Sequence, residues 1–239
     1  LVGASGVAQS KIYSAGSGSR CTSGKLLKDG KRLLAGYDDG VVRLWSLKDL
    51  TNVQTKLPSE VNIIEISDTS LGLAAVGTIS GDVHIMNTGT PEEPSLRVLL
   101  TMPALAAKAG EEKMEEEEES IDSCVECCSF GPSSLLAVGR NDGTVAVYNT
   151  DHVAPRFEHT NESAQAITRV VWVSIDNRPL LVTASVDSFV RVFDGRDGSV
   201  VKEVCCGGDE VLDLVLLQTE PLRFLAACSQ GNIRVLEIQ

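Results

Sequence analysis

The side chains with the clearest chemical potential in this sequence are carboxylates. Nine consecutive residues, from Glu111 to Glu119, contain seven glutamates. A like-charged block of this kind repels itself and is typical of a solvated loop or of a tail that attracts opposite charge. Two interpretations stay open, a tail that speeds the capture of a basic client and an inert loop. The glutamates are Glu111, Glu112, Glu115, Glu116, Glu117, Glu118 and Glu119.

Further carboxylates fall in the polar turns and connections between apolar runs. We expect Asp38, Asp209 and Glu210 to converge with the glutamate run on one face of the molecule. A shallow basin of carboxylates would focus its field on a segment rich in Lys and Arg and accelerate its capture. Other turn aspartates have a local interpretation, because Asp side chains bond to the backbone of their own turn. The residues expected to cap their turns are Asp39, Asp142 and Asp187.

Cys124, Cys127 and Cys128 have a spacing that also occurs in metal sites. A zinc site needs four ligands, and the sequence offers no second pair of this spacing and no nearby pair of histidines. In a strand, Cys127 would also point away from the face that Cys124 and Cys128 share. We therefore expect these thiols to pack in the core, and we expect no metal and no cofactor.

No catalytic arrangement stands out. The sequence lacks the phosphate-binding Gly-x-x-x-x-Gly-Lys, the His-Glu-x-x-His of metalloproteases and the Gly-x-Ser-x-Gly of hydrolases. The segment 16–18, Gly-Ser-Gly, lacks the third glycine and the following helix of a dinucleotide site. We expect a binding protein and not an enzyme, and we name no catalytic residue.

Charge, hydropathy and cysteine content limit the classes of partner and the compartment that we expect. The formal net charge is −12 and the pI is about 4.7, which disfavours direct binding to nucleic acid and favours basic partners. Acidity also keeps a protein soluble, and that simpler interpretation stays open. No run of about 18 apolar residues occurs, so we expect no membrane span. Seven cysteines, an odd number, do not suggest a disulfide framework and favour a reducing compartment.

A repeated phrase predicts the elements that would position these residues. An apolar run, a tight polar turn and a second, alternating run recur five times, beginning at Leu33, Leu73, Leu136, Leu181 and Leu225. The alternation is the period-2 signal of a half-buried strand, and the Asp-Gly pairs are typical of tight hairpin turns. Without the acidic insertion the period is about 40–45 residues, the length of one four-stranded propeller blade.

We therefore expect an all-β fold, the C-terminal part of a β-propeller with about five blades of seven or eight in the whole. Residues 1–239 would form a single domain fragment, with an acidic insertion at 103–120 between blades. The last unit, Gly207–Gln239, has three strand-like runs, which fits closure by a strand from the N-terminal end. The strands expected in the clearest blade are Cys21–Leu27, Arg32–Tyr37, Val41–Ser46 and Asn52–Leu57.

The repeats carry a family resemblance. The segment Gly36–Ser46, Gly-Tyr-Asp-Asp-Gly-Val-Val-Arg-Leu-Trp-Ser, resembles the signature of WD-repeat propellers, and Val190–Asp194 repeats it with Phe in the Trp position. In that family a turn Asp, a strand hydroxyl, a loop His and the strand Trp form a structural network. The resemblance implies that Trp45 packs within its blade. The residues that it implies for the network of the fifth unit are Asp187, Thr183 or Ser185, His159 and Phe193.

A closer resemblance covers nearly the whole chain from Cys21 onward. The stretch Cys21–Gly40, and the acidic insertion followed by Ser120–Asn149, are similar to the family of the angio-associated migratory cell protein. That family includes a yeast chaperone dedicated to one late-joining protein of the large ribosomal subunit. The resemblance implies a chaperone whose acidic face grips the basic N-terminal tail of a ribosomal protein.

The animal relatives imply an alternative, a signalling or cytoskeletal scaffold or adaptor linked to cell migration. Such an adaptor would bind its partner through an apolar pocket or edge, with little salt dependence. The net charge and the glutamate run favour the chaperone. We expect a monomer in the cytoplasm, with the nucleus left open.

Overall fold

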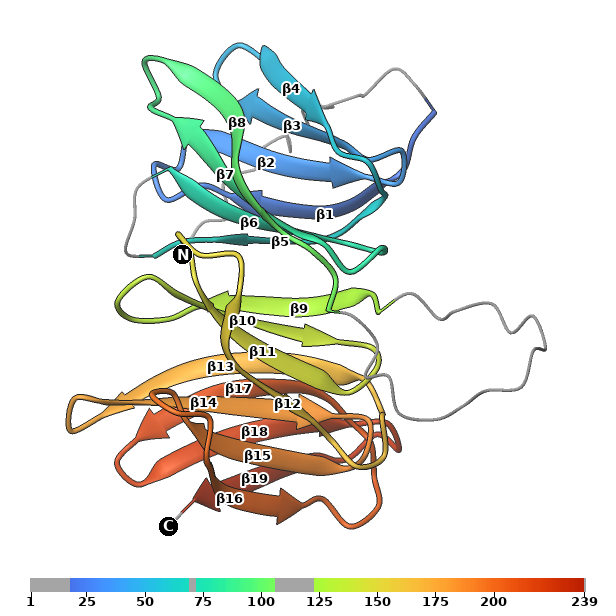
Figure 1. Ribbon diagram of the computed structural model, residues 1–239, viewed down its shortest axis with the longest axis vertical. Helices are drawn as coiled ribbons and strands as arrows, with labels where there is room; N and C mark the ends of the chain where they lie inside the picture. The colour runs from blue at the N-terminus through green and yellow to red at the C-terminus, as the bar shows by residue number, and fades with distance from the viewer. Residues whose placement is uncertain (1–17, 69–71, 106–122, 239) are drawn as a thin grey trace, which may run out of the picture.

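The chain folds into antiparallel β-sheets (Figure 1). This computed structural model describes residues 18–68, 72–105 and 123–238. These residues form nineteen strands and no helix, so none of them belongs to a helix that could cross a membrane. Four sheets have four strands each and the fifth has three.

Each sheet is a meander made from one continuous stretch of chain, because consecutive strands pair antiparallel. The first sheet holds β1 (Cys21–Leu26), β2 (Arg32–Tyr37), β3 (Val41–Ser46) and β4 (Asn52–Lys56). The second holds β5 (Val61–Ile66), β6 (Leu73–Thr78), β7 (Val83–Gly89) and β8 (Pro94–Met102). The third holds β9 (Val125–Phe130), β10 (Leu135–Arg140), β11 (Thr144–Asn149) and β12 (Pro155–Thr160). The fourth holds β13 (Ile167–Ile175), β14 (Arg178–Ser185), β15 (Phe189–Asp194) and β16 (Val200–Cys205). The last holds β17 (Val211–Thr219), β18 (Leu222–Cys228) and β19 (Ile233–Ile238).

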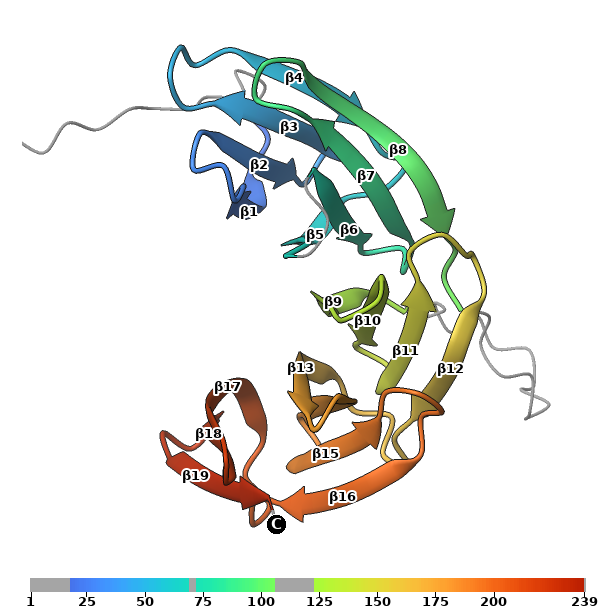
Figure 2. The same cartoon turned by 90° about the vertical axis from the view of Figure 1, so that its left-hand side faces the viewer.

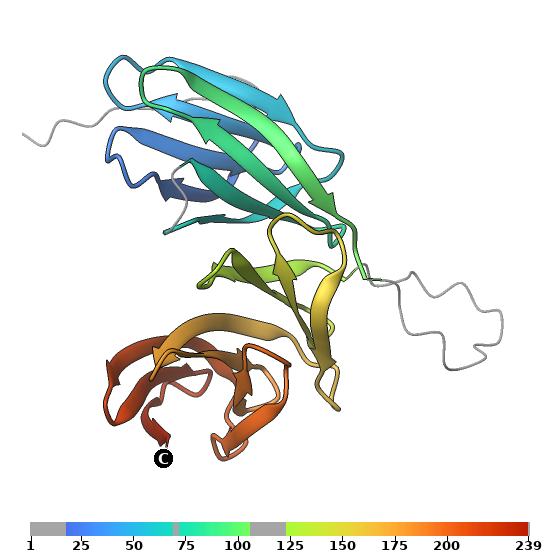
Figure 3. The same cartoon turned by 60° about the vertical axis from the view of Figure 1, so that its left-hand side comes forward.

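The sheets are arranged as the blades of a propeller. Figure 2 shows them along an arc, with β1, β5, β9, β13 and β17 on its inner side and β4, β8, β12 and β16 on its outer side. Neighbouring inner strands contact one another along the whole arc. Figure 3 shows the same succession from an intermediate direction, with the first two blades at one end and the last two at the other.

The hydrophobic core lies between neighbouring blades. One cluster joins Leu34 of the first blade to Ile64 of the second, and another joins Val182 of the fourth blade to Phe224 of the fifth. Because side chains alternate along a strand, β10 packs Leu136 and Val138 into one cluster and Leu135 and Ala137 into another, so both faces of this sheet are buried. A Cβ on Gly36 would collide with the side chain of Val61 at the start of the next blade. Glycine at this position therefore lets the next inner strand approach closely.

A repeated hydrogen bond ties the inner strands together. The side chain of the second residue of an inner strand donates to the carbonyl oxygen of the first residue of the next inner strand. The three bonds are Thr22 Oγ1 to Val61 O at 2.5 Å, Asn62 Nδ2 to Val125 O at 2.8 Å, and Thr168 Oγ1 to Val211 O at 2.7 Å.

The step from the third to the fourth blade departs from this pattern. The second residue of β9 is Glu126, and a carboxylate accepts hydrogen bonds but does not donate them. The thiol of Cys127 takes over, with Sγ 3.4 Å from Ile167 O. A thiol is a weak donor, so this junction has the weakest of the four inner-strand links.

The all-β prediction is confirmed. In the first blade, β1 and β4 each end one residue earlier than expected, and β2 and β3 have the expected bounds. The last sheet has three strands within the described residues, as expected. The start of the chain through residue 17 and the part of the acidic insertion at 106–122, which contains Glu111–Glu119, lie outside the described residues.

Candidate functional site

The tight turns between the second and third strands of each blade share one face with the connections between blades. We call this the turn face. In three blades an amide at the start of the connection donates to a carbonyl of the turn: Leu57 N to Gly40 O at 2.8 Å, Asn161 N to Gly143 O at 3.1 Å and Cys206 N to Ser188 O at 2.7 Å. The turns lie at 38–40, 79–82, 141–143, 186–188 and 229–232. The described connections lie at 57–60, 103–105, 123–124, 161–166 and 206–210.

The three aspartates expected to cap their turns each accept a backbone hydrogen bond there. The acceptors and donors are Asp39 Oδ1 with Val41 N at 3.1 Å, Asp142 Oδ1 with Thr144 N at 2.9 Å, and Asp187 Oδ1 with Phe189 N at 3.0 Å. The second oxygen of each carboxylate faces a serine hydroxyl from the preceding connection: Ser19 at 2.6 Å, Ser123 at 2.6 Å and Ser163 at 3.4 Å. Both oxygens of these carboxylates are therefore engaged within the blade.

Asp38 is also engaged, although it was expected to face a partner. Its two oxygens accept hydrogen bonds from Arg20, one from the backbone N and one from Nε, both at 2.9 Å. The guanidinium of Arg20 is mostly exposed. The bond from this side chain lowers the pKa of Asp38, and the bond from Ser19 lowers the pKa of Asp39. Both carboxylates therefore keep their negative charge at neutral pH and below it.

Asp209 requires a correction. It was expected on the binding surface, but its residue is only 2 % exposed. Its carboxylate accepts from Ser229 Oγ at 3.1 Å, from Gln230 N at 3.0 Å and from Asn232 Nδ2 at 2.8 Å. These donors, Asn232 first, lower its pKa. Asp209 organises the last turn and is not available for direct contact with a partner.

Glu210 follows Asp209 on the turn face and is exposed. Only its backbone oxygen bonds within the blade, as the acceptor of Ser229 N at 3.0 Å. Glu162, on the connection before the fourth blade, is also exposed and was not singled out in the sequence. These two side chains can meet a partner directly.

The described residues on either side of the segment 106–122, which holds most of the acidic insertion, lie on the turn face between the second and third blades. Ala104 N donates to Asp82 Oδ1 at 3.0 Å, and Ser123 Oγ donates to Asp142 Oδ2 at 2.6 Å. The chain therefore enters and leaves the segment 106–122 beside the turn residues Asp82 and Asp142.

The structural network that was expected to include His159 is built around Asn161 instead. His159 lies in strand β12 and packs its ring edge against Phe193, with 5.1 Å between centroids. The loop position is taken by Asn161, which is 4 % exposed. Its Nδ2 donates to Gln165 O at 2.8 Å and to Ser185 Oγ at 3.1 Å. The amide makes the link to the strand hydroxyl that the family resemblance gives to a histidine. Trp45, as implied, is buried beside Ala35 and Tyr37 of its own blade.

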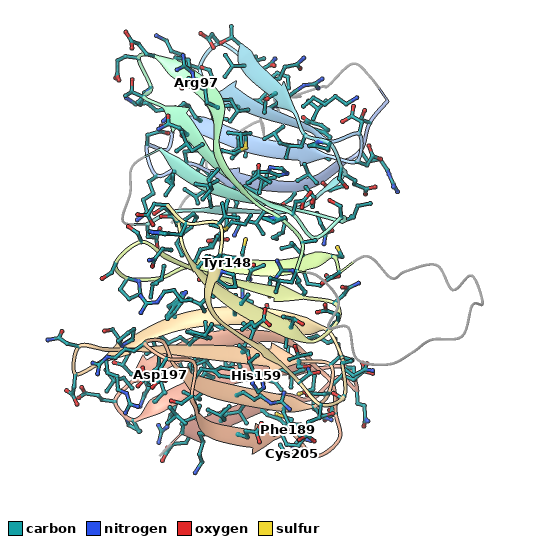
Figure 4. The ribbon with its side chains drawn as sticks, viewed as in Figure 1. Arg97, Tyr148, His159, Phe189, Asp197 and Cys205 are labelled. Carbon is teal, nitrogen blue, oxygen red and sulfur yellow. The ribbon has the colours of Figure 1, made fainter. Side chains whose placement is uncertain are left out.

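A polar cavity of about 300 Å³ opens beside this network. His159 and Phe189 both line it, and Figure 4 labels them in the lower blades. Arg191 also lines it, with Nη1 2.7 Å from Asp187 Oδ2 and Nε 2.7 Å from Glu203 Oε1. Its guanidinium also stacks 5.0 Å from the ring of Phe189. The cation therefore forms ion pairs with two carboxylates of its own blade.

Four of the seven cysteines are buried, whereas Cys21 and Cys205 are exposed. Cys127 and Cys128 belong to two different core clusters, on opposite sides of β9. Burial raises the pKa of Cys127 to about 12 and that of Cys124 to about 11. In the described part of the chain, no three His, Cys, Asp or Glu side chains gather where they could hold a metal ion.

Comparison with known families places the chain. A family profile described as "Nucleolar protein 10-like, N-terminal domain", a β-propeller, matches residues 47–231. The chain belongs to this family. The Nucleolar protein 10-like segment is preceded by a match to the WD domain, G-beta repeat, at residues 10–46.

Several curated proteins are similar to parts of this Nucleolar protein 10-like propeller. The human angio-associated migratory cell protein is 28 % identical over 204 residues, which cover 82 % of this chain and 44 % of the relative. A U3 small nucleolar RNA-associated protein 21 homolog from Schizosaccharomyces pombe is 27 % identical over 119 residues, 48 % of this chain and 12 % of the relative. The chain thus spans less than half of the length of these relatives. The resemblance to the angio-associated migratory cell protein is confirmed.

Solved structures agree on the fold. The crystal structure of Sqt1 from Saccharomyces cerevisiae has a TM-score of 0.75 at 18 % identity, over 92 % of this chain and 60 % of that one. A chain of the crystal structure of the mitotic checkpoint complex has a TM-score of 0.73 at 18 % identity, over 93 % and 62 %. The predicted WD-repeat β-propeller, seen in part, is confirmed.

Proposed function

We propose that this Nucleolar protein 10-like propeller is a dedicated chaperone. It holds the basic tail of a ribosomal protein at its turn face until that protein joins the large subunit. The observation that carries the proposal is the position of the acidic insertion. Ala104, near its start, and Ser123, shortly after it, are hydrogen-bonded to Asp82 and Asp142 on the turn face. In the sequence, seven glutamates lie between these two residues.

The turn carboxylates and the exposed glutamates have different tasks in this proposal. Asp38 and Asp39 are ionised but hydrogen-bonded, so they act through their field and not through contact. Glu162 and Glu210 are exposed and can pair directly with Lys or Arg. Exposed charges are screened over about 10 Å at 0.1 M salt. The insertion and the turn carboxylates therefore raise the rate of capture more than the final affinity, and both effects weaken as salt rises.

The comparisons support a role in ribosome assembly through two names. The matching family is named for a nucleolar protein, and one relative is named for association with a small nucleolar RNA. Ribosomal subunits are assembled in nucleoli, where a chaperoned ribosomal protein would be delivered. We place the protein in the cytoplasm with access to the nucleus, as a monomer that contacts its client and not RNA.

An adaptor role is the second candidate. Three curated relatives that each cover 82 % of this chain, the angio-associated migratory cell proteins of human, orangutan and dog, are named for migratory cells. A signalling or cytoskeletal adaptor would not need the acidic insertion, and its partner would be held by apolar contacts that salt does not weaken.

Affinity capture from a native cell extract distinguishes the chaperone role from the adaptor role. The tagged full chain is used at about 50 mM and about 300 mM salt, a range over which screening changes strongly, and bound proteins are identified and quantified. We expect one stoichiometric basic ribosomal protein that is lost at the higher salt. Salt-resistant recovery of cytoskeletal or signalling proteins, without a ribosomal protein, would overturn the chaperone in favour of the adaptor.

A further inference from the structure

The first two blades enclose a groove on the face opposite the turn face. Two cavities of about 570 and about 250 Å³ share Arg32 and Pro91 in their walls. They are lined by the loops β1–β2, β3–β4, β5–β6 and β7–β8, all of which lie at the blade ends away from the turn face. The larger cavity lies in the size range of sites for small ligands or a few side chains of a peptide.

Arg32 forms a rigid partition between the two cavities. It is 6 % exposed, and its Nε donates to Asp29 Oδ2 at 2.6 Å. Its Nη1 donates to Thr88 O at 2.5 Å and to Thr90 O at 3.1 Å. Through these bonds the first blade is pinned to the β7–β8 loop of the second. The groove is therefore preformed, and a ligand would not have to order it.

The wall and the rim of the larger cavity differ in chemistry. Its apolar wall comes from Leu44, Val53 and two prolines, Pro91 and Pro94. Its rim carries Lys31 and Lys48. Both lysines are exposed, and neither ammonium group pairs with a carboxylate of the described residues. Two unpaired cations beside an apolar cavity are notable in a chain with a net charge of −12.

We propose that this groove binds a short acidic peptide. An aliphatic side chain of the peptide occupies the cavity against Leu44, Val53 and Pro94, and adjacent carboxylates pair with Lys31 and Lys48. The partner is thus opposite in charge to the client proposed for the turn face, and it sits on the other side of the blades. The two sites can be occupied together, and this inference does not depend on the proposed function.

The available cations favour carboxylates over phosphate. Phosphopeptide sites use clusters of Arg, whose planar guanidinium binds two oxygens at once. The one arginine in the wall, Arg32, already donates to Asp29 and to backbone carbonyls. The rim offers only lysines, which act as point charges. A peptide with carboxylates is the better match.

Nearby acids limit how much negative charge the groove accepts. Glu92 and Glu93 lie between the two wall prolines and are exposed, but they do not line the cavity. Asp49 lies beside Lys48, and its carboxylate is held by Thr51 N and Thr51 Oγ1 at 3.2 and 2.8 Å. We therefore expect a peptide with one short acidic cluster and not a long acidic tract.

The direct test is fluorescence anisotropy with the full chain and a labelled peptide with the core Leu-Glu-Glu-Leu, flanked by glycines. The reversal pair Lys31→Glu and Lys48→Glu should weaken binding about tenfold or more, the equivalent of about 1.4 kcal/mol. Replacing both peptide leucines with glycine should have a similar effect. Glu92→Gln with Glu93→Gln should tighten binding, because two repulsive charges are removed.

A matched reversal pair, Lys56→Glu with Lys202→Glu, serves as the control. Both lysines are exposed and neither lines the cavity. If the unaltered chain did not bind the peptide, or if both reversal pairs lowered its affinity equally, the proposal would be overturned. A phosphoserine version of the peptide that binds tenfold tighter would overturn it too, in favour of a phosphopeptide.

Discussion

Asp209 Oδ2 lies 2.8 Å from Asn232 Nδ2. Compared with the third blade, the positions of the hydrogen-bond donor and acceptor are exchanged. There, Ser123 in the connection donates to Asp142 in the turn at 2.6 Å. Asp209 and Ser123 both stand two residues before an inner strand, β17 and β9 respectively. In the last blade the acid is in the connection and the turn supplies the donors. The link between connection and turn is kept although the turn has lost its Asp-Gly pair.

The first prediction concerns this reversed link. Asp209→Ala should lower the melting temperature, because Ser229 Oγ, Gln230 N and Asn232 Nδ2 lose their acceptor. Asp209→Asn should have a smaller effect, since it keeps one acceptor oxygen. The exposed neighbour offers the control, Glu210→Ala. Thermal unfolding followed by circular dichroism is the measurement, and equal melting temperatures for the two alanine variants would contradict the structural role.

The second prediction concerns the bonds between inner strands. Thr168→Val removes the donor to Val211 O and should lower the free energy of unfolding by about 1 kcal/mol. Thr168→Ser keeps a hydroxyl donor and should retain most of the stability of the unaltered chain. Glu126→Thr should restore a donor at the irregular junction and raise the free energy by up to about 1 kcal/mol. Urea unfolding measures both. A destabilised Glu126→Thr variant would show that the missing donor is not the weak point.

The third prediction is a loss of stability in mild acid through His84. This side chain is 3 % exposed, its Nδ1 lies 2.9 Å from Thr101 Oγ1, and burial lowers its pKa. Near its ordinary pKa of about 6.5 the unfolded chain takes up the proton first. Stability should therefore be unaffected by His84 above this pH, fall as the pH drops below it, and level off below the lowered pKa.

The urea midpoint between pH 8 and pH 5 tests this effect. In His84→Gln the fall across this range should be smaller than in the unaltered chain. A pH profile that is the same in both proteins would exclude His84 as the source.

The fourth prediction concerns thiol reactivity. Cys21 and Cys205 are exposed, whereas Cys127 and Cys128 are buried. Burial raises the pKa of both buried thiols, so little thiolate is present near neutral pH. Iodoacetamide should label Cys21 and Cys205 first in the native protein, and all seven cysteines only in denaturant. Mass spectrometry of the labelled peptides gives the order. Early labelling of Cys127 would contradict the packing between the third and fourth blades.

The strands could be predicted from the sequence because their signals are local. Alternation and an Asp-Gly turn predicted β2 and β3 with the bounds that the structure has. The roles of Asp209, Asn161 and Arg32 depend on which loops meet in space. Nothing local distinguishes the buried Asp209 from the exposed Glu210 beside it. The role of Asn161 could have been predicted from its spacing in the sequence to the turn residue Asp187, if an amide had been considered in place of the histidine.

The candidate site was predicted less completely than the fold. The turn aspartates were expected to bind either the backbone or a partner, and the serine and arginine donors that fill their second oxygens come from separate connections. These pairs form only when the chain is folded and the connection lies against the turn of its blade. The glutamate run stays a prediction, since it lies outside the described residues.

The most direct test of the central claim is the association rate of a labelled peptide rich in Lys and Arg, measured by stopped flow at about 50 mM and about 300 mM salt. The comparison is between the full chain and a variant with Gln at Glu111, Glu112 and Glu115–Glu119. We predict a rate that falls steeply with salt in the unaltered chain, and a low-salt rate about tenfold lower in the variant. Equal rates for both proteins at low salt would contradict capture of a basic client at the turn face.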